Sequence, residues 1–163
     1  MEYESAGCLF TDKQTFLAGF QRKQQRWTSF GGKKYHGETP FMTAMREVIE
    51  ELFEVSITQK TLTKLVCLIQ FSFQHQDGSY IYYIYPYDTI FQIIDILYED
   101  GYTSPLYDEW PSSLSELIHT RKTIDIAEME NIQLFYKNEI QDIHDVLDKF
   151  FYKDLTKLFE DTN

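Results

Sequence analysis

One continuous stretch, residues 31–55, constrains the fold of this chain more than any other. Thr39 is a good N-cap, Pro40 stands where a missing N–H costs a helix nothing, and no Gly or Pro follows before Phe53. Apolar residues recur here at helical spacing, at Phe41, Ala44, Met45, Val48, Ile49 and Leu52. The stretch therefore predicts a helix that starts after Thr39 and packs one face on a core.

The opposite face of this predicted helix is acidic. Glu47 lies three residues before Glu50 and four before Glu51, so their carboxylates are neighbours that repel one another. A cluster of carboxylate oxygens suits a hard divalent cation, above all Mg²⁺ with Mn²⁺ as the alternative, which takes oxygen ligands and is completed by substrate phosphates. Arg46, four residues before Glu50, is placed to orient the cluster. A solvated acidic face is the plainer alternative, and the Gly-Gly pair ahead of the helix favours the cation site.

The same stretch resembles the Nudix box. That pattern is a Gly, five residues, a Glu, seven residues, Arg-Glu, a bulky aliphatic, any residue, Glu-Glu, any residue, a Gly and a second bulky aliphatic. The matching positions are Gly32, Glu38, Arg46, Glu47, Val48, Glu50 and Glu51. The match fails at its end, where Phe53 replaces the Gly and Glu54 the aliphatic residue. Because that Gly normally ends the helix in a left-handed turn, we expect this helix to run on to Val55.

The resemblance implies an α/β fold, a Nudix-like α/β/α sandwich around a mixed β-sheet. It also implies a magnesium-dependent pyrophosphohydrolase that cleaves the P–O–P bridge of a nucleoside diphosphate linked to another group. The metal ligands it implies are Glu47, Glu50, Glu51, Gly31 and, late in the chain, Glu128. The catalytic residues it implies are Glu50, Glu51 and Arg46, with Glu50 or Glu51 as general base. Glu38 and Gly32 would support them.

Four basic residues near the box are candidates for substrate binding. They are Arg22, Arg26, Lys33 and Lys34. Arg suits bidentate contact with phosphate, and lysines directly after a Gly pair are placed to meet a polyphosphate. A solvent-exposed basic loop is the alternative. The four histidines lack the spacing of a metal site.

The whole chain, residues 1–163, is expected to form a single Nudix-like domain with an insertion at about 88–125. A formal net charge of -11 disfavours a general nucleic-acid or anionic-membrane binder, which needs a basic surface. Two cysteines make no disulfide framework, and no signal peptide or membrane-spanning run is evident. We therefore expect a cytoplasmic protein with a nucleotide-type small-molecule substrate and no membrane partner; the oligomeric state stays open.

Alternation and turn residues predict the remaining elements. A first hairpin is expected from strands at 6–10 and 15–20. A second is expected from strands at 62–73 and 80–87, around a turn at 76–79. Further elements are expected at 114–120 (a helix), 126–136 (an acidic stretch and a strand) and 139–159 (a helix that covers the sheet).

Three other functions stay open at this point. Decapping of mRNA, by m7G cap hydrolysis, would use the same chemistry; the basic residues beside the box favour it and the net charge opposes it. Hydrolysis of diphosphoinositol polyphosphates would need a denser basic pocket. A non-catalytic nucleotide-binding or regulatory module is opposed by the intact box carboxylates, because a site without catalysis has no reason to hold repelling charges together.

Overall fold

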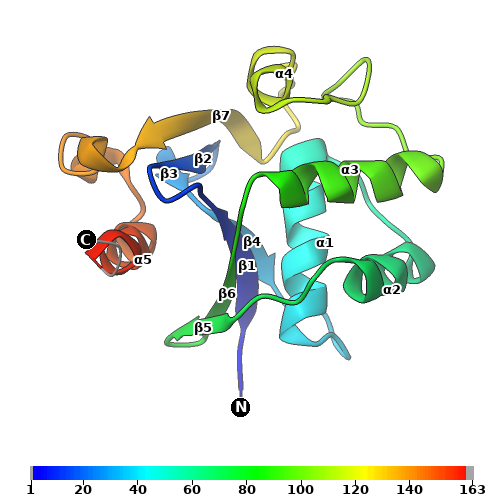
Figure 1. Ribbon diagram of the computed structural model, residues 1–163, viewed down its shortest axis with the longest axis horizontal. Helices are drawn as coiled ribbons and strands as arrows, with labels where there is room; N and C mark the ends of the chain where they lie inside the picture. The colour runs from blue at the N-terminus through cyan, green and yellow to red at the C-terminus, as the bar shows by residue number, and fades with distance from the viewer. Residues whose placement is uncertain (1, 161–163) are drawn as a thin grey trace.

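Over residues 2–160, the part of the chain that the computed structural model describes, two β-sheets lie between helices (Figure 1). The strands are β1 (Ser5–Phe10), β2 (Thr15–Gln21), β3 (Arg26–Thr28), β4 (Phe30–Lys33), β5 (Gln74–Asp77), β6 (Tyr80–Tyr85) and β7 (Met129–Tyr136). The α-helices are α1 (Pro40–Phe53), α2 (Gln59–Leu68), α3 (Asp88–Glu99), α4 (Leu114–His119) and α5 (Lys149–Glu160). In this part of the chain, no helix is both long enough and apolar enough to cross a membrane.

The strands form two sheets, and α1 packs on the first of them. One has the strand order β4-β1-β6-β5, in which β1 runs antiparallel to β4 and parallel to β6. The other has the order β3-β2-β7 and is antiparallel throughout. The first sheet is therefore mixed, and the predicted mixed-sheet α/β architecture is confirmed.

The core lies on both faces of the sheets because the strand side chains alternate. Along β1, Ala6, Cys8 and Phe10 belong to the cluster that packs with α1, α2 and α3, whereas Leu9 belongs to the cluster that packs with α5. Figure 1 shows the same division, with α1 to α3 on one side of the strands and α5 on the other. This is the predicted α/β/α sandwich.

The predicted first hairpin is wrong in its pairing. Both strands form, but β1 and β2 belong to different sheets, and an isolated bridge between Thr11 and Phe16 links the chain between them. The reason is that both edges of β1 are already taken, by β4 and β6. β2 pairs instead with β7, far along the sequence.

The predicted strand at 62–73 is also wrong, because most of it is helix α2. Thr58 caps this helix through its hydroxyl, and Leu62 and Leu65 bury its apolar face. The strand that pairs with β6 around the predicted turn is the short β5, which begins after this segment. Within the predicted insertion, α4 confirms the helix expected at 114–120, and α3 is a helix that the sequence reading did not predict.

The C-terminal helix begins about ten residues later than predicted. Two short 3-10 turns, at Lys137–Glu139 and His144–Val146, precede α5. The intervening chain pairs with β3 instead of coiling, since the Asp148 N–H donates to the Trp27 carbonyl at 2.8 Å. The Asp148 carboxylate then accepts hydrogen bonds from the first amides of α5 and starts the helix there.

Candidate active site

Helix α1 begins as its sequence predicts. The Thr39 hydroxyl accepts a hydrogen bond from the Met42 N–H at 3.2 Å, and Pro40 occupies the first turn. The apolar face of α1 is buried in the core, and Glu47 and Glu51 are buried as well, against the glycines of β4. The helix therefore holds its carboxylates against the β1–β4 edge of the mixed sheet.

The end of α1 differs from the prediction that it runs on to Val55. The helix ends at Phe53, and Glu54 takes the left-handed conformation, with φ 52°, that a Gly usually supplies. Phe53 is fully buried, and its ring lies 5.2 Å from the Trp110 ring, edge to face. The Glu54 carboxylate accepts a hydrogen bond from the Glu128 N–H at 2.9 Å, so this unusual turn also fixes the segment that carries Glu128.

Arg46 is the centre of the polar network on α1. Its Nε donates to Glu38 at 2.7 Å, its Nη1 donates to Glu47 at 2.8 Å and to Glu50 at 3.2 Å, and its Nη2 donates to the Lys33 carbonyl at 2.7 Å. One buried guanidinium thus joins three carboxylates and the end of β4. The sequence-based expectation that Arg46 orients the cluster agrees with this placement.

Glu38 is the anchor of that network outside α1. Its carboxylate also accepts hydrogen bonds from the Tyr35 N–H and the Thr43 hydroxyl, at 2.8 and 2.9 Å. Burial works against ionisation, but the hydrogen bonds from Arg46, Tyr35 and Thr43 outweigh it and lower the pKa of Glu38. Glu38 is therefore a charged support for Arg46.

Two glycines of β4 allow carboxylates to touch the backbone. A Cβ on Gly32 would lie 2.4 Å from both Cδ and Oε2 of Glu47, so only Gly leaves room for that carboxylate. The Gly31 N–H donates to Oε1 of Glu51 at 2.5 Å. Glu47 and Glu51 are thereby held at the surface of β4, whereas Glu50 is half-buried beside Arg46.

The pKa shifts show how crowded these carboxylates are. Burial, followed by repulsion from Glu128, raises the pKa of Glu51 well above its ordinary value, although the Gly31 amide opposes the shift. Burial raises the pKa of Glu47 against the opposing effect of Arg46, with Glu50 and Glu128 adding repulsion. Burial also raises the pKa of Glu128, as do the charges of Glu54 and Glu50. The carboxylates that the sequence assigned to one cluster act electrostatically on one another.

A cavity of about 500 Å³ opens beside these groups, a size typical of small-molecule sites. From the predicted site it is lined by Glu51, Glu128, Gly31 and Gly32. Glu50 and Glu128 also line a smaller hollow of about 370 Å³ next to the end of α1. The structure therefore brings the late Glu128 to the box.

The donor set fits a hard divalent cation. Four carboxylates repel one another here, and a bound cation would reduce that repulsion. One of them, Glu47, lies directly against the backbone because Gly32 has no side chain. As placed within residues 2–160, no three Asp, Glu, His or Cys side chains converge closely enough to form a metal site. Hydrogen bonds from Arg46 and from the Gly31 amide hold the box carboxylates in their present directions.

The four basic residues predicted to bind substrate lie outside this cavity. Arg22 donates to the carbonyls of Ala127 and Ile124, and Arg26 donates to that of Asp145. The ammonium of Lys34 lies 5.0 Å from the centre of the Tyr3 ring, and Lys33 is exposed with its carbonyl bound by Arg46. None of the described residues that line the cavity is Lys or Arg. Their role in substrate binding stays a prediction.

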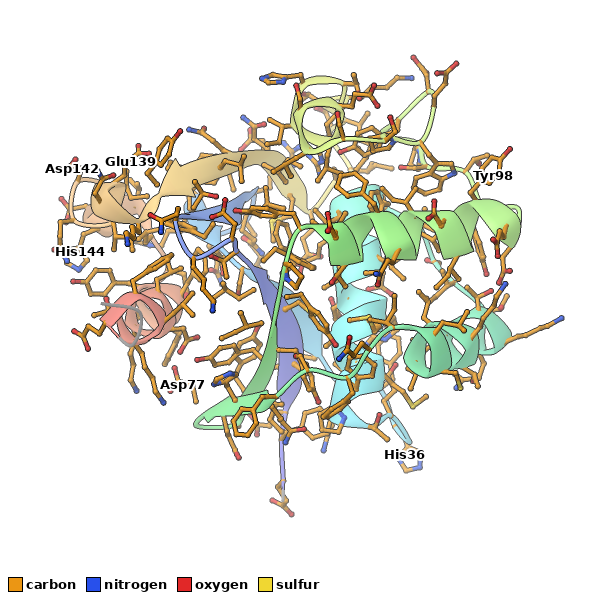
Figure 2. All side chains as sticks on the ribbon, in the orientation of Figure 1. His36, Asp77, Tyr98, Glu139, Asp142 and His144 are labelled. Carbon is orange, nitrogen blue, oxygen red and sulfur yellow. The ribbon has the colours of Figure 1, made fainter. Side chains whose placement is uncertain are left out.

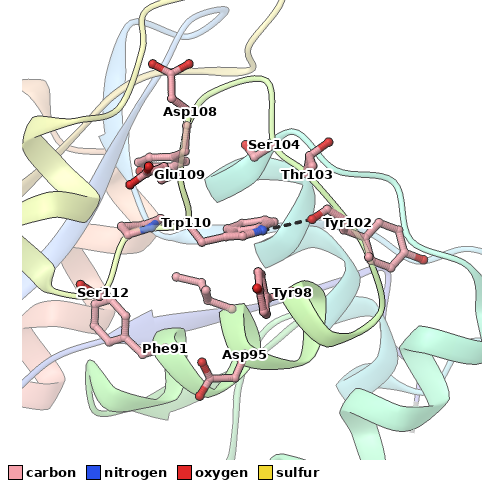
Figure 3. Close-up of a pocket in the computed structure, with 14 residues that line it drawn as sticks. Phe91, Asp95, Tyr98, Tyr102, Thr103, Ser104, Asp108, Glu109, Trp110 and Ser112 are labelled. Carbon is pink, nitrogen blue, oxygen red and sulfur yellow. Dashed lines mark hydrogen bonds between the residues drawn. The ribbon is translucent and has the colours of Figure 1, made fainter.

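A larger hollow, of about 840 Å³, lies elsewhere, between α3 and the loop that follows it (Figure 3). The Trp110 indole N–H donates to the Tyr102 carbonyl across it at 3.0 Å. No box residue lines it, and no residue of 88–125 is among the described residues that line the cavity beside Glu51. The predicted insertion therefore builds a separate surface.

Three acidic residues that line the cavity, Asp77, Asp148 and Asp154, are not among the predicted site residues. Asp77 ends β5, and Asp154 lies on α5 between the core residues Phe151 and Leu155. The sequence predicts a turn at Asp77 and a C-terminal helix that includes Asp154. The available signal was a charged residue on the apolar face, three positions after Phe151 and one before Leu155.

Comparison with known proteins agrees with the geometry of α1. A family model described as NUDIX domain matches residues 1–105. A comparison with curated proteins gives no match.

Among solved structures, a bifunctional NMN adenylyltransferase/ADP ribose pyrophosphatase from Francisella tularensis, complexed with AMP and a Mn ion, is similar with a TM-score of 0.51 and 16% identity. The match covers 100% of this chain and 42% of that one, so this chain spans less than half of its length. A NUDIX family hydrolase from Clostridium perfringens has a TM-score of 0.50 at 13% identity, over 100% and 99% of the two chains. A NUDIX hydrolase from Nitrosomonas europaea has a TM-score of 0.50 at 11% identity, over 99% and 90%. At such identities the likeness concerns the fold.

Proposed function

Because this chain belongs to the NUDIX family of hydrolases, which act on phosphorus-containing anhydrides, we propose that it is a divalent-metal-dependent pyrophosphohydrolase. Its substrate is a nucleoside diphosphate linked to another group, cleaved at the P–O–P bridge. The observation that carries the proposal is the packing of the Glu47 carboxylate on Gly32 while Arg46 joins it to Glu38 and Glu50. A solvated acidic helix face needs none of these contacts.

Glu47, Glu50, Glu51 and Glu128 would hold the metal, Mg²⁺ or Mn²⁺, with the main chain at Gly31 beside them. When bound, such an ion supplies charge neutralisation for the phosphate oxygens and a lowered pKa for the attacking water. Arg46 orients the carboxylates of Glu47 and Glu50 through hydrogen bonds, and Glu38 holds the Arg46 guanidinium in place.

In the reaction, the oxygen of water forms a bond to one phosphorus of the bridge. The bond from that phosphorus to the bridging oxygen breaks, and the other phosphate leaves with that oxygen. A general base accepts the proton that water loses, and Glu50 and Glu51 are the two candidates for this role. Glu50→Gln and Glu51→Gln, made separately, distinguish the two candidates. The variant that lacks the general base should lose turnover even at a high metal concentration.

A small nucleotide suits the cavity better than the two other substrate classes. A volume of about 500 Å³ lies within the range of small-ligand sites, and its lining includes no Lys or Arg among the described residues. The guanidinium groups of Arg22 and Arg26 donate hydrogen bonds to main-chain carbonyls. Neither an RNA backbone nor a diphosphoinositol polyphosphate, both densely anionic, gains the basic contacts that it needs there.

A substrate screen tests the proposal. The panel is a nucleotide sugar, ADP-ribose, a dinucleoside polyphosphate, a nucleoside triphosphate and capped RNA, each with and without Mg²⁺ or Mn²⁺. We expect metal-dependent hydrolysis of a nucleoside diphosphate derivative, with a nucleoside monophosphate among the products, and a strongly reduced turnover by Glu51→Gln. Absence of turnover on the whole panel would contradict the proposal and favour a non-catalytic nucleotide-binding module.

A further inference from the structure

The segment between α4 and β7, residues 120–128, brings Glu128 to the box although it is neither helix nor strand. Figure 1 shows this segment passing the C-terminal end of α1 before β7 begins, and Figure 2 shows side chains filling the space between the two. Glu128 is exposed, whereas its neighbours Ala127 and Met129 are buried. The chain is therefore buried on both sides of Glu128 while Glu128 itself remains accessible.

Arg22, the residue directly after β2, holds this segment at three points. Its Nε donates to the Ala127 carbonyl and its Nη2 to the Ile124 carbonyl, both at 2.9 Å. Its main-chain N–H donates to the Glu128 carbonyl, also at 2.9 Å. A planar guanidinium bonds two carbonyls in fixed directions, which a flexible ammonium does not do. Arg22 therefore fixes the path of the chain up to Glu128.

A second guanidinium, that of Arg121, ties the segment to α1 and β7. Its Nη1 donates to the Met129 carbonyl at 3.0 Å, and its Nη2 donates to the Glu51 carbonyl at 3.3 Å. Arg121 thus links the main chain of one box carboxylate to the residue that follows Glu128. The Glu128 N–H is bonded as well, because it donates to the Glu54 carboxylate. Hydrogen bonds from separate parts of the fold hold the chain before, at and after Glu128.

Packing alone does not account for two arginines here. Burial lowers the pKa of Arg121, and the nearby charge of Arg22 adds to the shift against the opposing effects of Tyr107 and Glu54. Within residues 2–160, the Arg121 guanidinium donates to carbonyls, and its Nε is buried without a partner. A partly buried charge without a close carboxylate costs stability, and apolar packing would hold a loop at lower cost.

The arrangement has its effect at the site. Glu128 and Glu51 repel each other, so the segment that carries Glu128 is pushed away from α1 while no cation lies between them. Arg121 joins that segment to the Glu51 carbonyl, and Arg22 joins it to β2. The two arginines therefore oppose the displacement that the repulsion favours.

We propose that Arg22 and Arg121 are positioning residues, which hold Glu128 against the repulsion of the α1 carboxylates and so keep it in place as a metal ligand. This rests on the proposed function, because Glu128 is a ligand only if the box binds a cation. Arg22 then acts on the metal through Glu128 instead of contacting a substrate phosphate, the role predicted for it from the sequence.

Metal binding without substrate tests the proposal. Mn²⁺ is titrated into the wild type, Arg22→Lys, Arg121→Lys and Lys122→Ala, and the free ion is measured by its electron paramagnetic resonance signal. Lys keeps the positive charge but does not bond two carbonyls as a fork. The Arg22 side chain is 32% exposed, so Arg22→Lys is expected to fold, and thermal unfolding checks every variant. Lys122→Ala is the control, because it removes a basic side chain of the same segment that pairs with Asp108 instead.

We expect Arg22→Lys and Arg121→Lys each to bind Mn²⁺ about tenfold more weakly, as is typical when a group that orients a metal ligand is lost. Lys122→Ala should match the wild type. In a Glu128→Gln background, Arg22→Lys should cost no more than about twofold, because the residue through which it acts no longer carries a carboxylate.

A folded Arg22→Lys variant that binds Mn²⁺ like the wild type would overturn the proposal, and so would a wild type that binds no Mn²⁺. An equal loss of affinity with and without the Glu128 carboxylate would also overturn it, since Arg22 would then act by another route. Failure of the proposed function has a different outcome, in which Mn²⁺ binding depends on Arg22 and Glu128 as expected and no substrate of the screen is hydrolysed.

Discussion

Replacing Gly32 with Ala changes one contact at the centre of the site. The backbone of β4 is extended there, so Ala brings no conformational strain of its own. Its Cβ, however, would lie 2.4 Å from Cδ and Oε2 of Glu47. An ordinary contact needs about 3.5 Å, so the carboxylate must withdraw by roughly 1 Å. Arg46 Nη1 lies 2.8 Å from Oε1 of Glu47 and would lose that bond.

The expected result is a large loss of activity with a modest loss of stability. Overpacking typically costs about 1–3 kcal/mol, and a misplacement of about 1 Å in a catalytic constellation costs on the order of 10²-fold in rate. Hydrolysis at saturating Mg²⁺ and thermal unfolding measure the two effects. Gly101→Ala is the control: its φ is +84° and nothing lies within 4 Å of the added Cβ, so it should cost about 1–2 kcal/mol of stability with turnover unchanged. A Gly32→Ala enzyme with near-normal turnover would refute this account of Gly32.

Three further predictions concern stability. Burial, followed by the hydrogen bond to Asp77, raises the pKa of Asp154 from its ordinary 3.8 to about 7, so the folded state holds a proton that the unfolded state releases between these values. Stability should therefore fall by up to about 4 kcal/mol as pH rises from 4 to 8, and urea titrations should show a flatter profile for Asp154→Leu. Free Mg²⁺ at ten times its dissociation constant should stabilise the wild type by about 1.4 kcal/mol, and less in Glu47→Gln, as calorimetry would show; no response in the wild type would contradict the metal site. Phe53→Gly, which restores the residue of the Nudix box, should destabilise by about 3 kcal/mol or more, because the fully buried ring packs on Trp110; an unchanged melting temperature would show that the ring contributes little.

The secondary structure was predicted best from the sequence where local signals agree with the tertiary fold. Thr39, Pro40 and the apolar spacing predict the start and the buried face of α1, and the box spacing predicts that Arg46 lies beside the carboxylates of the same helix. The end of α1 was mispredicted because the missing Gly is offset by tertiary contacts. Phe53 gains burial, and Glu54 tolerates a left-handed backbone while its carboxylate caps the Glu128 amide.

Strand pairing lay beyond the sequence for a different reason. Alternation identifies a strand but not its neighbour, and β2 finds its partner in β7 more than a hundred residues later. The apolar run that became α2 has few residues and is ambiguous between helix and strand. Asp77, at the end of β5, and Asp154, on α5, are far apart in the sequence, so only the folded structure brings both to the cavity.

The turnover of Glu51→Gln is the most direct test of the claim that the α1 carboxylates perform metal-dependent hydrolysis. The amide keeps an oxygen for the Gly31 N–H and removes a carboxylate that is 1% exposed and repelled by Glu128, so stability should hold or rise. We predict that kcat, measured at saturating Mg²⁺ on the best substrate of the screen, falls by at least about 10²-fold while the melting temperature does not fall. A well-folded Glu51→Gln enzyme with the turnover of the wild type would contradict the claim.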